Sequence, residues 1–157
     1  MNKHKIKVSV ISILIAEAVG GLSAFLTRDS METYSTAIVQ PPLSPPAILF
    51  PIVWGILYAL MGIGAARIYM TGPSADRSKG INLYVAQLVV NFFWSLIFFN
   101  AQAFGFAFFW LLFLWVLVLC MILTFRKIDT IAAYLQIPYL IWLTFAAYLN
   151  AGVWYLN

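Results

Sequence analysis

The sequence has little charge and few of the side chains that bind metals or form disulfides. Only 9% of its 157 residues are charged, whereas a soluble domain carries about a quarter. Its one cysteine, Cys120, excludes an intrachain disulfide. With His4 as the one histidine, the chain has no material for a conventional zinc or haem-ligand cluster. The net charge of +4 is scattered along the chain, which argues against a nucleic-acid-binding surface.

Apolar residues are abundant instead and make up 64% of the chain. A helix needs about 20 apolar residues to cross ~30 Å of hydrocarbon. Five stretches are long enough: 6–26, 46–70, 81–100, 104–125 and 130–154. Lipid-exposed backbone must be hydrogen-bonded within its own segment, and these continuous runs lack the alternation of β-barrel strands. The sequence therefore predicts an all-α integral membrane bundle of five transmembrane helices, forming a single domain over 1–157.

The distribution of lysine and arginine predicts the orientation in the membrane. With five spans, the side of the N-terminus carries these basic residues: Lys3, Lys5, Lys7, Arg67, Arg77, Lys79, Arg126 and Lys127. The other side carries only Arg28. The positive-inside rule then predicts a cytoplasmic N-terminus and an external C-terminus. The first span also resembles a signal peptide with a cleavage site at 22–24, but Glu17 and the length of the apolar region argue against cleavage.

The longest predicted connection, 27–44, lies on the outer side and ends in prolines. A residue before proline avoids helical geometry, so we expect Pro45 to be the last non-helical residue and Pro46 to start the second span. Pro51 and Pro138 are expected to interrupt the second and fifth spans. A loop of this length is often a lid or binding element. A passive connector is the alternative.

Helical spacing brings aromatic and amide side chains to similar depths in three spans. Trp54, Asn91, Trp94 and Trp142 lie roughly 9–18 Å below the outer ends of their spans, from the helical rise. Indoles and a carboxamide at one depth suit a flat aromatic ligand. Plain helix packing is the alternative. Glu17, an acid within a span, indicates either a proton or cation site or a neutral, hydrogen-bonded carboxyl group.

Three motifs resemble the tryptophan-rich sensory protein / translocator protein (TspO/MBR) family, also called the peripheral-type benzodiazepine receptor family. They are "PPLSPPAILFPIVWGILYALMG" (41–62), "AQLVVNFFWSLIFF" (86–99) and "IPYLIWLTFAAYLNAGVW" (137–154). The resemblance implies a five-helix bundle in the membrane lipid, commonly a homodimer, with an outer-half cavity under the first loop. It also implies binding of tetrapyrroles such as protoporphyrin IX and haem, as ligands rather than built-in cofactors, and of synthetic benzodiazepine-type ligands.

Carried over residue by residue, the resemblance implies these ligand-binding residues: Tyr34, Pro45, Trp54, Asn91, Trp94, Trp142, Phe145 and Ala146. It further implies light- and oxygen-dependent degradation of protoporphyrin IX at a bacterial cell membrane. Because indoles are oxidisable, Trp54 and Trp142 are the expected catalytic electron donors. The alternatives are a transporter of tetrapyrroles or lipophilic cations, and a ligand-gated sensor or scaffold.

One departure concerns cholesterol, which animal members are said to bind through a C-terminal Leu-x-Tyr-x-Arg-type motif. Here Ala151 stands where the tyrosine would be, and no lysine or arginine follows Lys127. A reversed match at Lys79, Tyr84 and Leu88 has little weight, since such patterns arise by chance. Cholesterol binding is therefore less expected than porphyrin binding.

Overall fold

Helices account for most of residues 2–157, the part of the chain that the computed structural model describes. They are α1 (Lys3–Ala37), α2 (Leu49–Tyr69), α3 (Ala75–Ser95), the π-helical turn η1 (Leu96–Asn100), α4 (Phe104–Ile128), α5 (Thr130–Tyr134) and α6 (Ile137–Leu156). η1 continues α3, and α5 leads into α6, so five segments are long and apolar enough to cross a membrane. No strand is found among the described residues. The predicted all-α bundle of five spans is confirmed.

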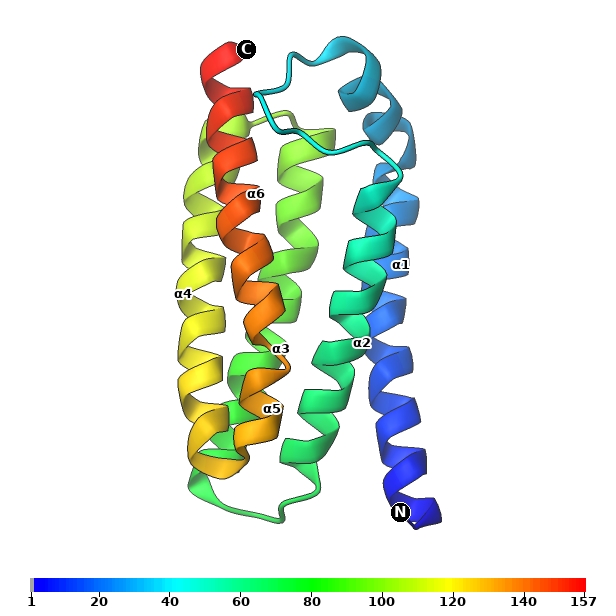
Figure 1. Ribbon diagram of the computed structural model, residues 1–157, viewed down its shortest axis with the longest axis vertical. Coiled ribbons are helices and arrows are strands. Elements are labelled where there is room, and N and C mark those ends of the chain that lie inside the picture. The colour runs from blue at the N-terminus through cyan, green and yellow to red at the C-terminus, as the bar shows by residue number, and fades with distance from the viewer. Residues whose placement is uncertain (1) are drawn as a thin grey trace.

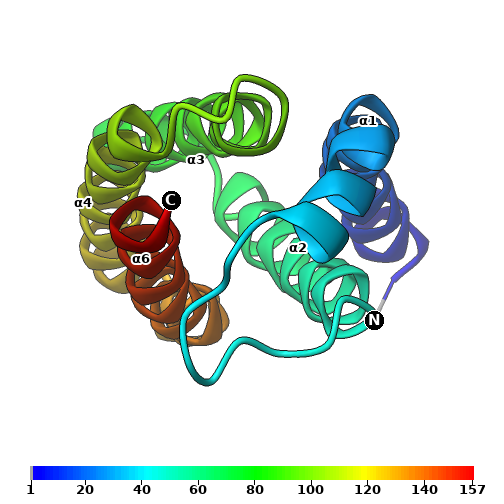
Figure 2. The same cartoon turned by 90° about the horizontal axis from the view of Figure 1, so that it is seen from above.

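The five segments run side by side, with the two termini at opposite ends of the bundle (Figure 1). We call the end with the N-terminus and Asp129 the base end. We call the other end, with Asn157 and the connection 38–48, the lid end. Seen along the axis, α1 lies at the edge beside α2, while α3, α4 and α6 complete the bundle (Figure 2). This arrangement leaves α1 the least buried of the five spans.

α1 and α2 touch closely in the base half of the bundle. A Cβ atom added at Gly62 would lie 2.5 Å from the Cα atom of Ile13, so only glycine fits there. The Ser12 hydroxyl donates a hydrogen bond to the Gly62 carbonyl at 2.7 Å. The two backbones are therefore held together by direct contact.

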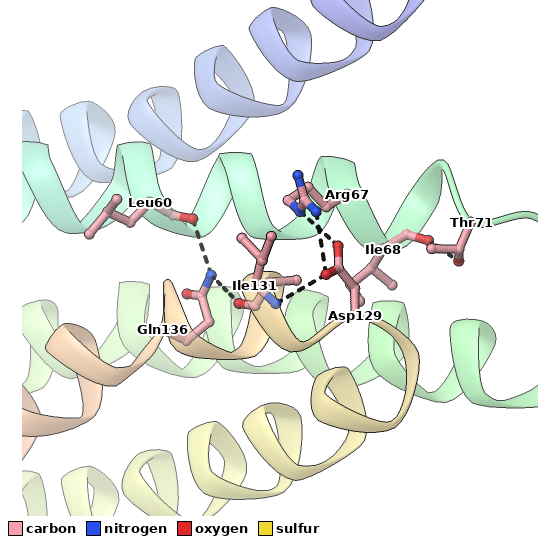
Figure 3. A network of polar contacts seen from close by, with 8 residues as sticks. Leu60, Arg67, Ile68, Thr71, Asp129, Ile131 and Gln136 are labelled. Atoms are coloured by element: carbon pink, nitrogen blue, oxygen red, sulfur yellow. Dashed lines mark hydrogen bonds and ion pairs between the residues drawn. The ribbon is translucent and has the colours of Figure 1, made fainter.

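A polar network ties α2 to the start of the fifth span at the base end (Figure 3). Arg67 Nε donates to Asp129 Oδ2 at 2.7 Å, and Asp129 Oδ1 caps α5 by accepting the Ile131 N–H at 3.0 Å. Burial would raise the pKa of the Asp129 carboxyl group. The hydrogen bond and charge of Arg67, with backbone N–H groups, outweigh burial and hold that pKa below its usual value. The ionised Asp129 side chain thus caps α5 and forms an ion pair with Arg67.

A second tie at the base end is the buried side chain of Gln136. Its Nε2 atom donates to the Leu60 carbonyl at 3.1 Å, as Figure 3 shows. A Cβ atom at Gly64 would lie only 2.2 Å from that Nε2, so the glycine makes room for the amide. α2 and the fifth span are therefore joined by an ion pair and, about two turns away, by an amide.

The predicted lid loop is wrong over 27–37, which the structure shows as the last three turns of α1. Contacts with η1 stabilise this extension. The Ser30 hydroxyl donates to Asn100 Oδ1 at 2.6 Å, and the Tyr34 ring packs edge-on against Phe99. The connection that remains is 38–48.

The predicted start of α2 and the roles of two prolines are also corrected. α2 begins at Leu49 instead of Pro46, which forms a preceding turn in which the Leu49 N–H donates to the Pro46 carbonyl. Pro51 is the third residue of α2, and Pro138 is the second of α6. N–H groups in a first turn have no partner within the helix, so neither proline interrupts its helix. The fifth span instead breaks before Pro138, between α5 and α6.

The third span begins earlier than predicted, at Ala75 instead of 81, because the Ser74 side chain caps it by accepting the Arg77 N–H at 3.0 Å. The fourth and fifth spans extend to Ile128 and Leu156, slightly beyond the predicted 125 and 154.

Candidate functional site

A cavity of about 260 Å³ lies in the lid half, between α1, α2, α3 with η1, and α6. Its lining residues are Gly20, Ser23, Ala24, Thr27, Met31, Tyr34, Phe50, Pro51, Trp54, Tyr58, Asn91, Trp94, Ser95, Phe98, Phe99, Trp142, Ala146, Leu149 and Asn150. Most of this surface is apolar or aromatic, and no charged side chain belongs to it among the described residues. The cavity therefore suits an apolar or aromatic body better than an ion.

Trp54 is the centre of an aromatic cluster on one side of the cavity. Its ring centroid lies 5.7 Å from that of Tyr58 and 6.5 Å from that of Trp142. Below the cavity, Tyr139 approaches the same indole edge-on at 6.1 Å. Such edge-to-face and tilted pairs are the favoured geometries of aromatic rings. The cluster places two oxidisable indoles side by side at the cavity wall.

Trp94, on α3, also lines the cavity and is held in a fixed orientation. Its Nε1 atom donates to Asn150 Oδ1 at 3.1 Å, while Asn150 Nδ2 donates to the Phe104 carbonyl at 2.8 Å. The indole also stacks on Phe98, with ring centroids 5.1 Å apart. Asn150 is fully buried, so its two bonds satisfy an amide at membrane depth and orient the indole.

Polar side chains form the floor of the cavity. Asn91 Nδ2 donates to the Tyr58 hydroxyl oxygen at 3.1 Å, with both residues buried. One turn below, Gln87 lies outside the lining and is fully buried. Its Oε1 accepts the Tyr139 hydroxyl at 2.7 Å. Of these two buried amides, Asn91 lines the cavity and Gln87 does not.

The residues of the α1 wall other than Tyr34 were missed by sequence reasoning. Gly20, Ser23, Thr27, Met31 and Tyr34 follow one another at intervals of three or four residues, which places them on one face of a helix. A Cβ atom at position 20 would lie 2.4 Å from the Tyr58 ring, so glycine allows that ring to pack. This spacing was the signal that could have identified the wall.

The π-helical turn η1 shapes the lid-end part of the cavity. The Ala101 N–H donates to the Leu96 carbonyl, the i→i+5 bond of a π turn. Two successive side chains, Phe98 and Phe99, line the cavity and contact Tyr34 at 5.6 Å and 5.3 Å between ring centroids. η1 therefore joins the cavity wall to the lid end of α1.

A smaller chamber of about 230 Å³ adjoins the cavity at the lid end. It is lined by Met31, Tyr34, Ser35, Gln40, Pro45, Ala47 and Phe50. Met31, Tyr34 and Phe50 line both spaces, so the two chambers share a boundary. Residues of the connection 38–48 close this second chamber.

The structure brings together most of the predicted site residues. Those that line the cavity are Tyr34, Trp54, Asn91, Trp94, Trp142 and Ala146. Pro45 lines the second chamber instead. Phe145 lines neither chamber and packs between Trp142, at 5.5 Å, and Tyr148, at 6.2 Å. Glu17 is half-buried on α1 and lies outside both linings.

The fold and the cavity define a multi-pass membrane protein with an aromatic, uncharged cavity in one half of its helix bundle. The family model described as TspO/MBR family matches residues 12–156. The chain belongs to the TspO/MBR family.

Named relatives agree with this assignment. The chain is 34% identical to "Tryptophan-rich protein TspO" of Chlorobaculum tepidum over 158 residues, covering 100% of this chain and 99% of the relative. It is 33% identical to "Translocator protein" of Ovis aries, covering 90% and 85%. It is 34% identical to "Tryptophan-rich sensory protein" of Cereibacter sphaeroides, covering 75% and 73%.

Proposed function

We propose that this protein binds planar tetrapyrroles, protoporphyrin IX or haem, in the cavity of the lid half. The observation that carries this proposal is the lining. Trp54, Trp94 and Trp142 all line an uncharged space that also has a few neutral polar groups, among them the Asn91 amide and the Tyr58 hydroxyl. Apolar faces for stacking and a small number of orienting polar groups are typical of sites for flat aromatic molecules.

The size of the site supports a ligand that occupies both chambers. The cavity alone is slightly smaller than the roughly 300–1,000 Å³ of small-molecule pockets. The adjoining chamber adds a similar volume with hydroxyl and amide groups at Ser35 and Gln40. The macrocycle would occupy the aromatic cavity, and its polar edge would extend into the second chamber.

We further propose that the bound porphyrin is degraded in the presence of light and dioxygen. In the proposed cycle, the light-excited macrocycle takes one electron from an indole and dioxygen adds to the resulting radical anion. The electron then returns to the indole radical cation, so that the indole is regenerated and both oxygen atoms remain on the opened macrocycle. Trp54 and Trp142 are the donors because they lie side by side at the wall, with ring centroids 6.5 Å apart. The protein supplies confinement and electron donors, while the reactivity belongs to the bound molecule.

Spectral titration of the purified protein with protoporphyrin IX, followed by irradiation with and without oxygen, tests both steps. Trp54→Phe and Trp142→Phe should bind porphyrin and degrade it more slowly. Trp154→Phe is a matched control because Trp154 is half-exposed and lies outside the cavity. Wild-type degradation rates in both cavity variants would contradict the role of the indoles. Absence of saturable binding would contradict the proposed ligand.

A second candidate function is passage of the ligand across the membrane, favoured by relatives named "Translocator protein". The cavity lining lies in the lid half, so transport would require the base half to open. Flux of protoporphyrin IX into proteoliposomes, with a pH gradient and with Glu17→Gln, tests it. Flux that equals that of empty liposomes, in wild type and variant alike, would exclude transport.

We also propose that the protein resides in a bacterial cell membrane with its base end in the cytoplasm. Eight of its nine lysine and arginine residues, all but Arg28, lie toward the base end, and such asymmetry normally sets orientation. Labelling of single cysteines placed at 73 or at 43 with a membrane-impermeant reagent, in intact cells, would test this. Labelling at 73 and protection at 43 would reverse the proposed orientation.

A further inference from the structure

The connection between α1 and α2 takes a longer path than its ends require. α1 and α2 pack against each other, yet the connection 38–48 runs across the lid end to α6 and then returns to α2 (Figure 2). Three hydrogen bonds and one close contact join it to α6 on the way. A direct turn from α1 to α2 would be shorter, so the contacts with α6 must stabilise the longer path.

Asn157 holds the first part of the connection. The Val39 N–H donates to Asn157 Oδ1 at 3.1 Å, and Asn157 Nδ2 donates to the Val39 carbonyl at 2.7 Å. One carboxamide thus satisfies both peptide groups of a single residue, as a neighbouring strand would. Further along, the Tyr148 hydroxyl donates to the Pro42 carbonyl at 2.6 Å.

Pro41 lies between these two attachment points and is buried, unlike its neighbours Gln40 and Pro42. Its ring rests on Gly152 of α6, where an added Cβ atom would lie 2.5 Å from the Pro41 Cβ. Position 152 therefore needs glycine for the connection to settle on α6.

The backbone at the tip of the connection is strained. Leu43 has a φ of 69°, and its side chain is 82% exposed. A left-handed backbone is unfavourable for a residue other than glycine and persists only where surrounding contacts impose it. The exposed side chain of Leu43 offers no compensating packing. The contacts that hold this geometry are those of the flanking residues: Pro41 and Pro42 contact α6, and the Ser44 hydroxyl donates to the Pro41 carbonyl at 2.7 Å.

We propose that Tyr148, Gly152 and Asn157 are positioning residues that latch the connection 38–48 onto α6 as the roof of the ligand site. Gln40, Pro45 and Ala47 of this connection close the second chamber, so releasing the latch opens that chamber. α6 also carries Trp142 and Ala146 into the cavity, so one helix holds both the roof and the wall. The role of the latch in ligand access rests on the proposed function, whereas the latch itself does not.

Hydrogen exchange of the ligand-free protein in lipid nanodiscs tests the latch directly. Tyr148→Phe and Gly152→Ala should each accelerate exchange in 38–48 about three- to tenfold, the effect of losing one hydrogen bond or close contact. Asn157→Leu removes both hydrogen bonds to Val39 and should accelerate exchange more than either. Tyr155→Phe and Gly55→Ala are matched controls, because Tyr155 is 90% exposed and a Cβ at Gly55 meets no atom within 4 Å. Wild-type exchange in 38–48 for Asn157→Leu and Tyr148→Phe would overturn the proposal.

Stopped-flow mixing with protoporphyrin IX then tests the role of the latch in access. The latch variants should bind and release the porphyrin about three- to tenfold faster, with a smaller change in Kd, because a gate affects both directions. Faster exchange with unchanged porphyrin rates would refute the role in access. If the wild-type protein binds no porphyrin, the proposed function fails, and the exchange experiment still decides whether the latch exists.

Discussion

The two halves of the bundle are built by different means. In the base half, helices touch backbone to backbone at Gly62 and are joined by the Arg67–Asp129 ion pair and the Gln136 amide. In the lid half, a cavity lined largely by rings separates α1, α2, α3 and α6, and the buried Asn150 amide joins α6 to α3 and to the start of α4. The lid half is closed by the connection 38–48 and by η1.

This difference indicates a division of labour along the bundle axis. Substitutions at closely packed or hydrogen-bonded buried positions lower stability, because a well-packed interior does not accommodate even one added or removed methylene group. A wall of aromatic side chains around a void can accommodate a ligand without separating the helices. We therefore expect substitutions in the base half to affect stability and substitutions in the lid half to affect binding.

The largest effect is expected for Gly62→Ala. The added methyl group would meet backbone atoms of Ser12 and Ile13, which cannot rotate away, so α1 must shift. Overpacking of this kind costs about 3 kcal/mol of unfolding free energy. Denaturation midpoints in detergent, compared with Gly55→Ala in the same helix, measure it. Equal midpoints for the two variants would show that the α1–α2 contact is not tight.

Tyr139→Phe tests the boundary between the halves. It removes the hydroxyl that donates to Gln87 Oε1, leaving a fully buried acceptor without its partner. Such a loss costs about 2 kcal/mol. The unfolding midpoint should fall, whereas Tyr155→Phe at an exposed position should leave it unchanged. If Tyr139→Phe is as stable as wild type, the floor of the cavity is not held by this bond.

Ser23→Leu should separate binding from stability. Ser23 is buried on the α1 wall, and a leucine there would fill part of the cavity. Porphyrin affinity should fall at least tenfold, or about 1.4 kcal/mol, with a much smaller change in the unfolding midpoint. Leu22→Met, on the exposed side of α1, is the control. A large loss of stability with normal binding would reverse the assignment of roles to the two halves.

The smallest effect is expected at the Arg67–Asp129 pair, which is partly exposed. Because the folded-state pKa of Asp129 is lowered, its contribution is present above the ordinary value of 3.8 and is lost as the pH falls through the folded-state pKa. Asp129→Asn keeps a capping side chain and should cost below about 1 kcal/mol at neutral pH. Unfolding midpoints measured against pH check this. An acid-induced loss as large in the variant as in wild type would assign that loss to other groups.

Much of the fold could be predicted from the sequence, and so could the parts of the site that α2, α3 and α6 contribute. Apolar runs define the spans because a backbone in the bilayer must form its hydrogen bonds within its own helix. Trp54, Asn91 and Trp142 are large or polar residues whose helical position gives their depth and face. Such residues mark a cavity from the sequence because their placement is costly unless they meet a partner or an open space.

The α1 wall, the extension of α1 and the π turn depend on contacts between segments that are distant in the sequence, and residue spacing does not reveal those contacts. Ser23 and Thr27 contribute to the cavity by being small, and smallness alone does not distinguish a void from close packing. The extension of α1 to Ala37 depends on its contacts with η1, since packing supplies most of the stability of a helix in a protein. The π turn requires one extra residue per turn, which no periodicity indicated.

The length of α1 has a consequence for the solvent that surrounds the two chambers. Its 35 residues span about 50 Å, well beyond the ~30 Å of hydrocarbon. The exposed side chains of Arg28, Asp29 and Glu32 are too costly to place in hydrocarbon, so they mark its boundary on α1. The cavity begins below this level at Gly20, and the second chamber lies above it beside Ser35. An amphipathic molecule held in both chambers would therefore keep its rings at hydrocarbon depth and its polar edge among the lipid head groups, straddling the interface as a free surfactant does.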